Sequence, residues 1–126
     1  MNVIRPPEGE EEGPIPLAWR PTLTAIVDSL VRRDPVVAQH LQDVERVSDA
    51  VRDQCVEALA AYGDIEFVRL PKSSWDSSVC QKWGDYWRCY IDLWTAQEGR
   101  SDLVLEVTAR VTPNGFRFAV GSAYVP

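Results

Sequence analysis

The sequence contains a single histidine, His40, and only three cysteines among its 126 residues. A structural zinc site needs about four cysteine or histidine ligands at short spacings. Cys80 and Cys89 are nine residues apart, and the chain has neither a Cys-x-x-Cys element nor a histidine pair. We therefore expect no metal and no other cofactor. In a reducing compartment the cysteines should be free thiols, with Cys55 and Cys89 buried and Cys80 reactive in a loop.

Long apolar runs and clustered basic residues are also lacking. No stretch approaches the roughly 18 apolar residues of a membrane-spanning helix, and the N-terminus carries acidic residues where a signal peptide would be apolar. We expect a cytoplasmic protein with no membrane partner. Thirteen Lys and Arg against nineteen Asp and Glu give a net charge of −6. This balance argues against nucleic acid as the partner and favours a basic protein.

Catalytic signatures are equally scarce. The chain has no Gly-x-Ser-x-Gly element and no glycine-rich phosphate-binding loop. His40 stands apart from any residue pattern that would make it a general base for a nucleophile. We therefore predict no catalytic residues.

The N-terminal segment differs in composition from the rest of the chain. Four prolines and the run Glu10-Glu11-Glu12 fall within its first 18 residues. Such a segment buries too little apolar surface to offset the entropy lost on ordering. The composition predicts a disordered, acidic, proline-rich tail over residues 1–18 and a single α+β domain over residues 19–126.

Helical periodicity follows the tail. Thr22 is a suitable N-cap for a first helix, and Ser48 for a second that ends at Gly63. Val36, Val37 and Leu41 suggest a short additional helix between them. The predicted apolar faces are formed by Leu23, Ile26, Val27, Leu30 and Val31 in the first helix, and by Val51, Cys55, Ala58, Leu59 and Tyr62 in the second.

Strand patterns occupy the second half of the chain. Residues 65–70, 86–94, 102–111 and 116–124 have the period-two alternation or the β-rich composition of strands, and Pro113-Asn114-Gly115 marks a tight turn. Because the helices precede the strands, the order predicts an α+β fold. Its N-terminal helices would pack on one face of an antiparallel four-stranded meander.

The alternation also assigns side chains to the two faces of this sheet. Trp87, Cys89, Ile91 and Leu93 would face the helices. A loop over residues 95–101 would place Arg88 opposite Thr108, Tyr90 opposite Glu106 and Asp92 opposite Val104 on the other face, which Arg110 extends. In the last strand, Phe116, Phe118, Val120 and Tyr124 would share the apolar face, with Ala119, Gly121 and Ala123 on the polar one.

The polar face and its neighbouring loops form the candidate binding surface. Trp75 and Trp83 precede the strand predicted over residues 86–94 and fit neither a helical nor a strand periodicity. They would either anchor the loop to the core or be exposed. The candidate residues are Trp75, Trp83, Tyr86, Arg88, Tyr90, Asp92, Trp94, Glu98, Arg100, Asp102 and Glu106.

Two functions are compatible with this surface, beside the simpler interpretation of a solvated sheet face. The first is a non-enzymatic protein-binding module, such as an immunity or antitoxin-like protein, because exposed tryptophans are frequent at protein interfaces. The alternative is a small-ligand-binding or enzymatic α+β domain with a pocket between helices and sheet. An exposed Trp75 or Trp83 would favour the first, and a concave pocket containing Arg88, Tyr90 and Glu106 the second. The sequence does not define the oligomeric state.

Two motifs resemble those of a known family. Trp75-Asp76-Ser77-Ser78 and the stretch DLWTAQEGRSDL, residues 92–103, are similar to a Trp-Asp-Ser-Ser element and an Asp-Leu-Trp-Thr-x-x-Glu-Gly-Arg-Ser-Asp-Leu hairpin in an uncharacterised family of small bacterial domains. The resemblance covers roughly residues 20–126. It implies a bacterial origin and a shared fold, and it supplies no established activity and no catalytic residues.

Overall fold

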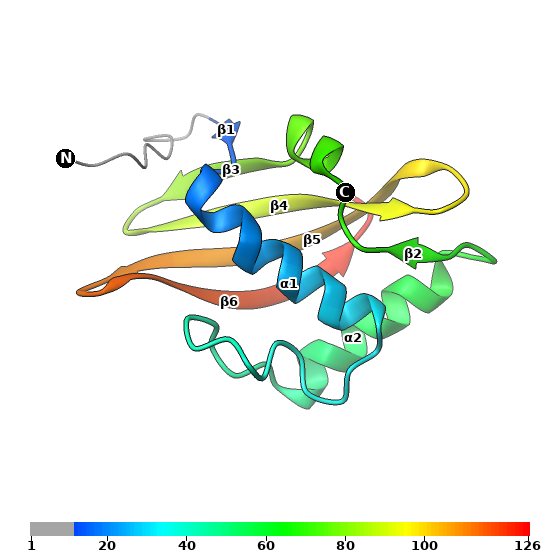
Figure 1. Ribbon diagram of the computed structural model, residues 1–126, viewed down its shortest axis with the longest axis horizontal. Helices are drawn as coiled ribbons and strands as arrows, with labels where there is room; N and C mark the ends of the chain where they lie inside the picture. Colours follow the sequence, from blue (N-terminus) through cyan, green and yellow to red (C-terminus); the bar gives the residue numbers. More distant parts are fainter. Residues whose placement is uncertain (1–11) are drawn as a thin grey trace.

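The computed structural model describes residues 12–126 (Figure 1). It contains two α-helices, two short 3₁₀ helices and six strands. In chain order the elements are β1 (Glu12–Pro14), η1 (Leu17–Trp19), α1 (Arg20–Val31), α2 (Asp49–Ala61), β2 (Phe67–Val68), η2 (Lys72–Asp76), β3 (Val79–Trp83), β4 (Tyr86–Thr95), β5 (Gly99–Thr112) and β6 (Gly115–Tyr124).

All strand pairs in the single sheet are antiparallel. The order is β1-β3-β4-β5-β6, and β2 pairs with β4 beside this path. The predicted α+β class is confirmed, but the sheet has six strands where four were predicted. The sheet also contains β1 and β3, and the strand expected over residues 65–70 is reduced to the two residues of β2.

The helix α1 lies across one face of the sheet (Figure 1). Its predicted apolar face is buried at Leu23, Ile26, Val27 and Leu30. The predicted cap at Thr22 is wrong, because the helix begins two residues earlier and the Thr22 hydroxyl donates to Asp43 Oδ2 at 3.2 Å. Pro21 fits the first turn, where a missing N–H has no cost.

No helix forms over residues 34–41, in contrast to the short helix expected there. Arg33 and Ala38 have φ angles of 59° and 53°, a left-handed conformation that interrupts a right-handed helix. The loop is anchored by Ser29, whose hydroxyl oxygen accepts from the Ala38 amide at 3.0 Å. Val37 is buried all the same, so the apolar pattern in this loop reflects packing onto the core.

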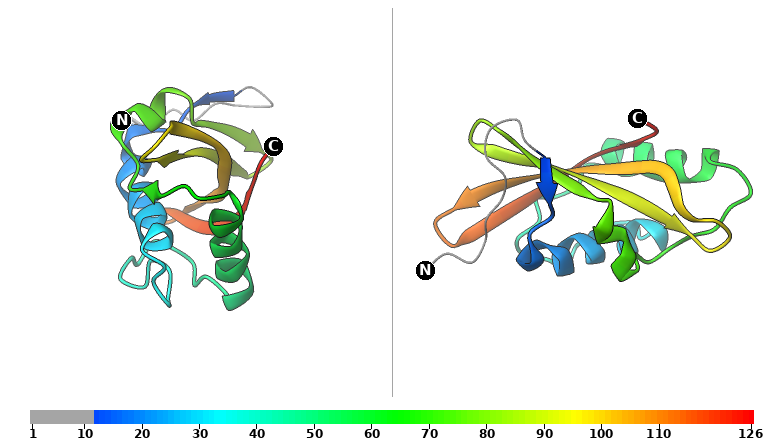
Figure 2. Two further views of the ribbon diagram at one scale, coloured as in Figure 1. Left: turned by 90° about the vertical axis from the view of Figure 1, so that its right-hand side faces the viewer. Right: turned by 90° about the horizontal axis from the view of Figure 1, so that it is seen from above.

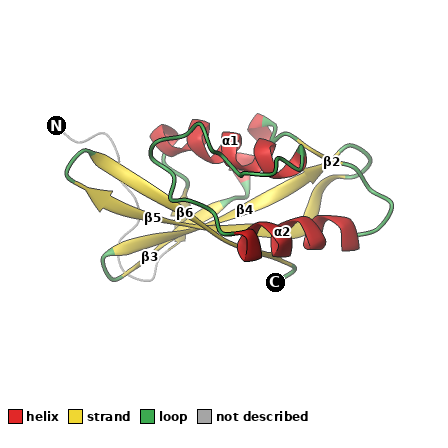
Figure 3. Cartoon of the chain, turned by 90° about the horizontal axis from the view of Figure 1, so that it is seen from below, coloured by secondary structure: helices red, strands yellow, loops and turns green. Residues whose placement is uncertain are grey.

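The helix α2 begins and ends as its sequence predicts. The Ser48 hydroxyl accepts from the Val51 amide at 3.2 Å, and Gly63 follows the helix with a φ of 119°. The helix packs along the end of β6, the last strand of the sheet (Figure 3). There the Gln54 amide bonds both the carbonyl and the N–H of Ala123, at 2.6 and 2.9 Å. The backbone of β6 at Ala123 is thereby unavailable to another strand.

The N-terminal prediction is corrected over residues 12–18. Glu12 to Pro14 form β1, and Gly13 lies opposite Cys80 of β3. Ile15 is 1% exposed, and its carbonyl accepts from Arg20 Nε at 3.0 Å. Backbone pairing and one buried isoleucine therefore order a segment whose composition alone predicts disorder. The tail predicted for residues 1–11 lies outside the described part of the chain.

The core lies between the helices and the inner face of the sheet (Figure 2). Trp19 is central to it, with edge-to-face contacts at centroid distances of 6.0 Å to Trp87, 4.9 Å to Phe116 and 5.8 Å to Phe118. Such aromatic pairs add about 0.5–1.5 kcal/mol beyond their area burial. The inward assignment of Trp87, Cys89, Ile91 and Leu93 is confirmed, because all four are buried.

A bulge in β6 changes the predicted faces near the C-terminus. Val107 pairs with Val120 and Leu105 with Ala123, so Gly121 and Ser122 both lie opposite Glu106. The extra residue reverses the alternation beyond it. Ala123 is therefore buried, and Tyr124, expected on the apolar face, pairs with Val104 on the opposite one.

At the bulge the backbone of residue 121 lies so close to that of Glu106 that only glycine fits without a shift. A Cβ atom built on Gly121 would lie 2.9 Å from the backbone oxygen of Glu106. Real Cβ atoms do not approach an oxygen so closely, so a larger residue would push the two strands apart.

Candidate functional site: an open aromatic and arginine face

The face of the sheet opposite the core is open to solvent. We call it the outer face, and it comprises Val79, Gln81 and Trp83 of β3, Tyr86, Arg88, Tyr90, Asp92 and Trp94 of β4, Val104, Glu106, Thr108 and Arg110 of β5, and Arg117, Ala119 and Tyr124 of β6. Of these, only Val104 is buried. Three predicted β4–β5 pairs are confirmed, with Arg88 opposite Thr108, Tyr90 opposite Glu106 and Asp92 opposite Val104. The loop predicted over residues 95–101 is wrong, because Thr95 already pairs with Gly99 and the register shifts between Asp92 and Trp94.

Arg88 is the centre of the cluster on this face. Its guanidinium carbon lies 4.6 Å from the ring centroid of Trp83 and 5.9 Å from that of Tyr86. Its Nε lies 3.8 Å from Glu106 Oε2. Hydrogen bonds to Tyr90 and Tyr86 raise the pKa of Arg88. Contacts with two rings and a carboxylate hold this cation in one orientation, with the face of Trp83 beside it.

Tyr124 completes the cluster beside Glu106. Burial raises the pKa of Tyr124, and the neighbouring Glu106 and Tyr90 raise it further. The residue was missing from the predicted surface because strict alternation assigns it to the core. The Gly121 in β6 is the sequence signal that could have indicated a bulge. We call Trp83, Tyr86, Arg88, Tyr90, Glu106 and Tyr124 the Arg88 cluster.

Asp92 and the Trp-Asp-Ser-Ser element hold the fold together. The Ser74 hydroxyl donates to the Asp92 carbonyl at 2.8 Å, and the Asp92 amide donates to Ser78 Oγ at 3.0 Å. The Ser77 hydroxyl donates to the Asp92 carboxylate. Three serines thus bond the carbonyl, amide and side chain of one residue, which fastens η2 to the middle of β4. These contacts give the predicted surface residue Asp92 a structural role.

The β4–β5 hairpin places another part of the predicted surface at the end of the sheet. Thr95 stabilises the turn, because its hydroxyl oxygen accepts from the Glu98 amide at 3.0 Å and its hydroxyl donates to the Gly99 carbonyl at 3.1 Å. Trp94 lies over Gly99. The side chains of Glu98, Arg100 and Asp102 are exposed around this turn. They belong to the hairpin, at the far end of β4 from Arg88.

Trp75 and Trp83, which follow neither a helical nor a strand periodicity in the sequence, have different environments. Trp83 is 43% exposed on the outer face. Trp75 packs partly against the core, and the Arg20 guanidinium carbon lies 5.6 Å from its ring centroid. It lines a separate groove of 480 Å³. The structure therefore brings Trp83 into the Arg88 cluster and leaves Trp75 outside it.

All three cysteines are buried, which corrects the prediction for Cys80. Cys80 lies in β3 directly opposite Cys89, and its thiol donates to the Pro14 carbonyl at 3.7 Å. Burial raises the pKa of Cys55 and of Cys80 to about 11, and burial with the nearby Cys80 raises that of Cys89. Protonated, enclosed thiols are poor nucleophiles.

Arginines gather at one end of the outer face. Arg110 and Arg117 are direct cross-strand partners. With Arg46 they line a hollow of 320 Å³, which we call the arginine hollow; its other lining residues are Glu45, Thr108 and Ala119. Thr108 also lies opposite Arg88, so the hollow adjoins the Arg88 cluster. Arg117 pairs with Glu45, whereas Arg46 and Arg110 have no acidic partner within residues 12–126.

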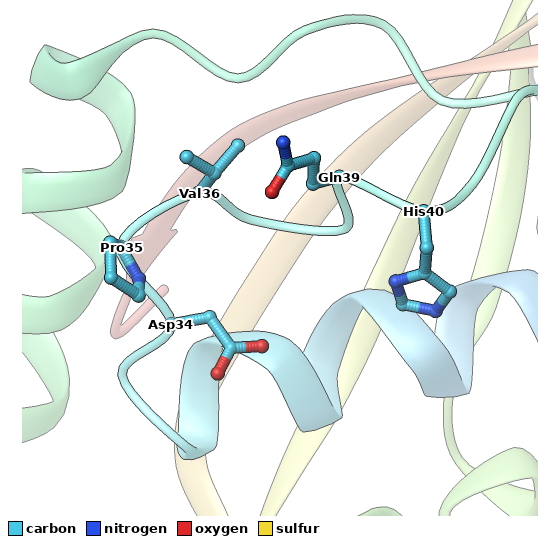
Figure 4. Close-up of a pocket in the computed structure, with 5 residues that line it drawn as sticks. All are labelled: Asp34, Pro35, Val36, Gln39 and His40. Atoms are coloured by element: carbon cyan, nitrogen blue, oxygen red, sulfur yellow. The ribbon is translucent and has the colours of Figure 1, made fainter.

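His40 lies in the loop after α1 and does not line the arginine hollow. It lines a hollow of 470 Å³ with Asp34, Pro35, Val36 and Gln39 (Figure 4). In the described part of the chain, no group of three or more His, Cys, Asp or Glu side chains is arranged to hold a metal ion. Over the same residues, neither α-helix has the length and apolar character needed to span a membrane.

The fold and the site define a small α+β domain with one sheet face packed by helices and one face open. Residues 27–126 match the family model described as "Domain of unknown function (DUF7668)", and the chain belongs to this family. The match extends from the middle of α1 to the last residue. The resemblance to an uncharacterised family is thereby confirmed. No curated protein and no solved structure matches the chain.

Proposed function

We propose that the protein is a non-enzymatic module that binds another protein through the Arg88 cluster. The observation that carries the proposal is the exposed Trp83 ring with the Arg88 guanidinium stacked 4.6 Å from its centroid. Tryptophan, tyrosine and arginine are the residues most enriched among interface hot spots. Here all three types occur together on one open face.

The rigidity of the cluster supports this proposal. Its side chains stand on four paired strands, β3 to β6, and Arg88 contacts Trp83, Tyr86 and Glu106. A binding group that is already ordered loses less conformational entropy when the partner arrives. The exposed Trp83 is also the feature that favours protein binding over a small-molecule pocket.

In its more specific form, the proposal is an immunity or antitoxin-like role in a bacterial cytoplasm. The net charge of −6 favours association with a partner that is basic overall, because opposite charges steer the encounter. Inhibition would then consist of occupying the partner's surface, which requires no reactive group on this chain.

Affinity capture with matched variants tests the proposed function. The tagged full-length protein, a Trp83→Ala/Arg88→Ala variant and an Arg69→Ala/Lys72→Ala control are incubated with lysate from the organism of origin. The control removes two cations that line the separate groove beside Trp75. We expect quantitative mass spectrometry to find a protein enriched by the wild type and the control and lost with the cluster variant. Equal enrichment by all three, or a metabolite that raises Tm without any captured protein, would contradict the proposal.

A further inference from the structure

The arginine hollow differs in charge from the molecule that contains it. The chain carries a net charge of −6, yet the six lining residues comprise three arginines and one glutamate. Steering over long distances depends on the summed charge, whereas contact depends on the groups within a few ångströms of the partner. The chemistry of this contact must therefore be derived from the hollow itself.

The pairing of Arg110 with Arg117 is unfavourable in the free protein. The two residues lie directly opposite each other on neighbouring antiparallel strands. Directly opposed residues have their Cβ atoms about 4.5–5.5 Å apart, and like charges in this arrangement are destabilising. Glu45 compensates Arg117 from the loop that pairs with β6, and within the described residues no carboxylate compensates Arg110 or Arg46.

We infer that the arginine hollow receives an acidic segment of the protein partner. A carboxylate placed between Arg110 and Arg117 would accept paired N–H bonds from planar guanidinium groups and would relieve the repulsion between them. This inference rests on the proposed function, because the hollow adjoins the Arg88 cluster through Thr108. A partner seated on that cluster would extend over the hollow.

Single-stranded nucleic acid is the competing occupant, since arginines and aromatic rings on a sheet also suit stacked bases and phosphates. The acidic groups on this face argue against it. Glu106 lies beside Arg88, and Glu45 lies within the hollow itself. A phosphate chain crossing the face would approach both carboxylates, whereas a peptide can place its own acidic residues at the arginines alone.

The inference is tested with a hexaglutamate peptide, acetylated and amidated at its ends, titrated into the full-length protein. The arginine Nε–H and backbone amide signals are followed by NMR. We expect shifts centred on Arg110, Arg117 and Ala119, and a Kd that rises with added NaCl because salt screens the contact. Hexalysine serves as the probe for a basic peptide, and a ten-nucleotide oligouridine as the probe for single-stranded nucleic acid.

Substitutions at Arg110 and at Glu45 should change the affinity for hexaglutamate in opposite directions. Arg110→Gln should weaken hexaglutamate binding about tenfold, and Arg110→Lys should recover part of the loss. Glu45→Gln should strengthen binding, because it releases Arg117 from its ion pair. The Arg69→Ala/Lys72→Ala control should change the Kd less than about twofold, and unchanged circular dichroism melting curves would show that the variants fold.

Three results would overturn the inference: shifts spread evenly over all arginines, an equal loss in the Arg69→Ala/Lys72→Ala control, or tighter binding of oligouridine at the same residues. The outcome is distinguishable from that of the proposed function. A captured protein whose affinity depends on Trp83 but not on Arg110 would contradict the acidic segment alone. Hexaglutamate binding at Arg110, without any captured protein, would contradict the proposed function alone.

Discussion

The two faces of the sheet use the same residue types for different purposes. Trp87 and Trp83 stand on neighbouring strands, four residues apart in the chain, and each is near a positively charged side chain. Trp87 is 8% exposed and joins the aromatic core around Trp19, whereas Trp83 is 43% exposed beside Arg88. Burial therefore decides what each ring does. On the inner face it holds the fold together, and on the outer face it remains available to a partner.

The largest expected effect distinguishes these two tryptophans. Trp87→Ala should lower the free energy of unfolding by about 3–5 kcal/mol, because it empties the centre of the core. Trp83→Ala should lower it by less than about 1 kcal/mol, since the ring is half exposed. Urea denaturation of both variants measures the difference. Equal losses would mean that the two faces are not distinct.

The β6 bulge is the next point of comparison, because it moves Tyr124 to the outer face. Gly121→Ala should destabilise the protein by about 1–3 kcal/mol, since the new Cβ would press on the Glu106 carbonyl. Ser122→Ala, at the exposed neighbouring position, is the matched control and should change the free energy of unfolding by less than about 0.5 kcal/mol. A tolerated alanine at residue 121 would contradict the close strand contact.

The serine contacts with Asp92 should have a somewhat smaller effect. Ser78→Ala removes the acceptor of the Asp92 amide and should cost about 1–2 kcal/mol. The exposed Ser73 offers a matched substitution, and Ser73→Ala should be nearly neutral. Thermal and urea unfolding would check both variants. Comparable effects at the two positions would contradict a role of the Trp-Asp-Ser-Ser element in fastening η2 to β4.

The cysteines of the core predict an effect that is absent at neutral pH and appears only in alkaline solution, as a loss of stability. In the folded protein the pKa of Cys55 and of Cys80 is raised from 9.0 to about 11. Between these values the unfolded chain loses thiol protons that the folded chain retains, so stability falls as pH rises from about 9 to about 11. A Cys55→Ala/Cys80→Ala variant should show a shallower fall of Tm over this range. The native wild type should also react slowly with a thiol reagent at all three positions, and rapid labelling of Cys80 would contradict its burial.

Local patterns in the sequence predicted the elements whose partners lie close along the chain. Strand β4 was identified with its faces because nine alternating residues leave a single possible arrangement, and α2 because Ser48 and Gly63 mark its ends. The β4–β5 pairs around Tyr90 were predicted from an assumed loop over residues 95–101. The actual turn is shorter, because Thr95 pairs with Gly99, and a register shift between Asp92 and Trp94 restores the predicted pairs. These features depend on short-range rules of period, capping and turn geometry.

The features that escaped prediction depend on contacts between distant segments. Strand β1 is three residues long and forms through pairing with β3, where Gly13 lies opposite Cys80. Tyr124 reached the outer face through a bulge, and Arg117 joined Arg46 through a loop that pairs with β6. Within the candidate surface, the sequence identified the Arg88 cluster except Tyr124. It also included Asp92, whose fixed role depends on serines 14 to 18 residues away.

The most direct test of the central claim is the affinity of the captured partner for Trp83→Ala, measured beside wild type and Lys72→Ala by isothermal titration calorimetry. Lys72 is an exposed residue that lines the separate groove beside Trp75. The account predicts that Trp83→Ala raises the Kd by at least about tenfold while the variant remains fully folded at the temperature of the titration, as expected of a hot-spot residue. Lys72→Ala should leave the Kd within about twofold of wild type. If Trp83→Ala binds as tightly as wild type, the outer face is not the binding surface.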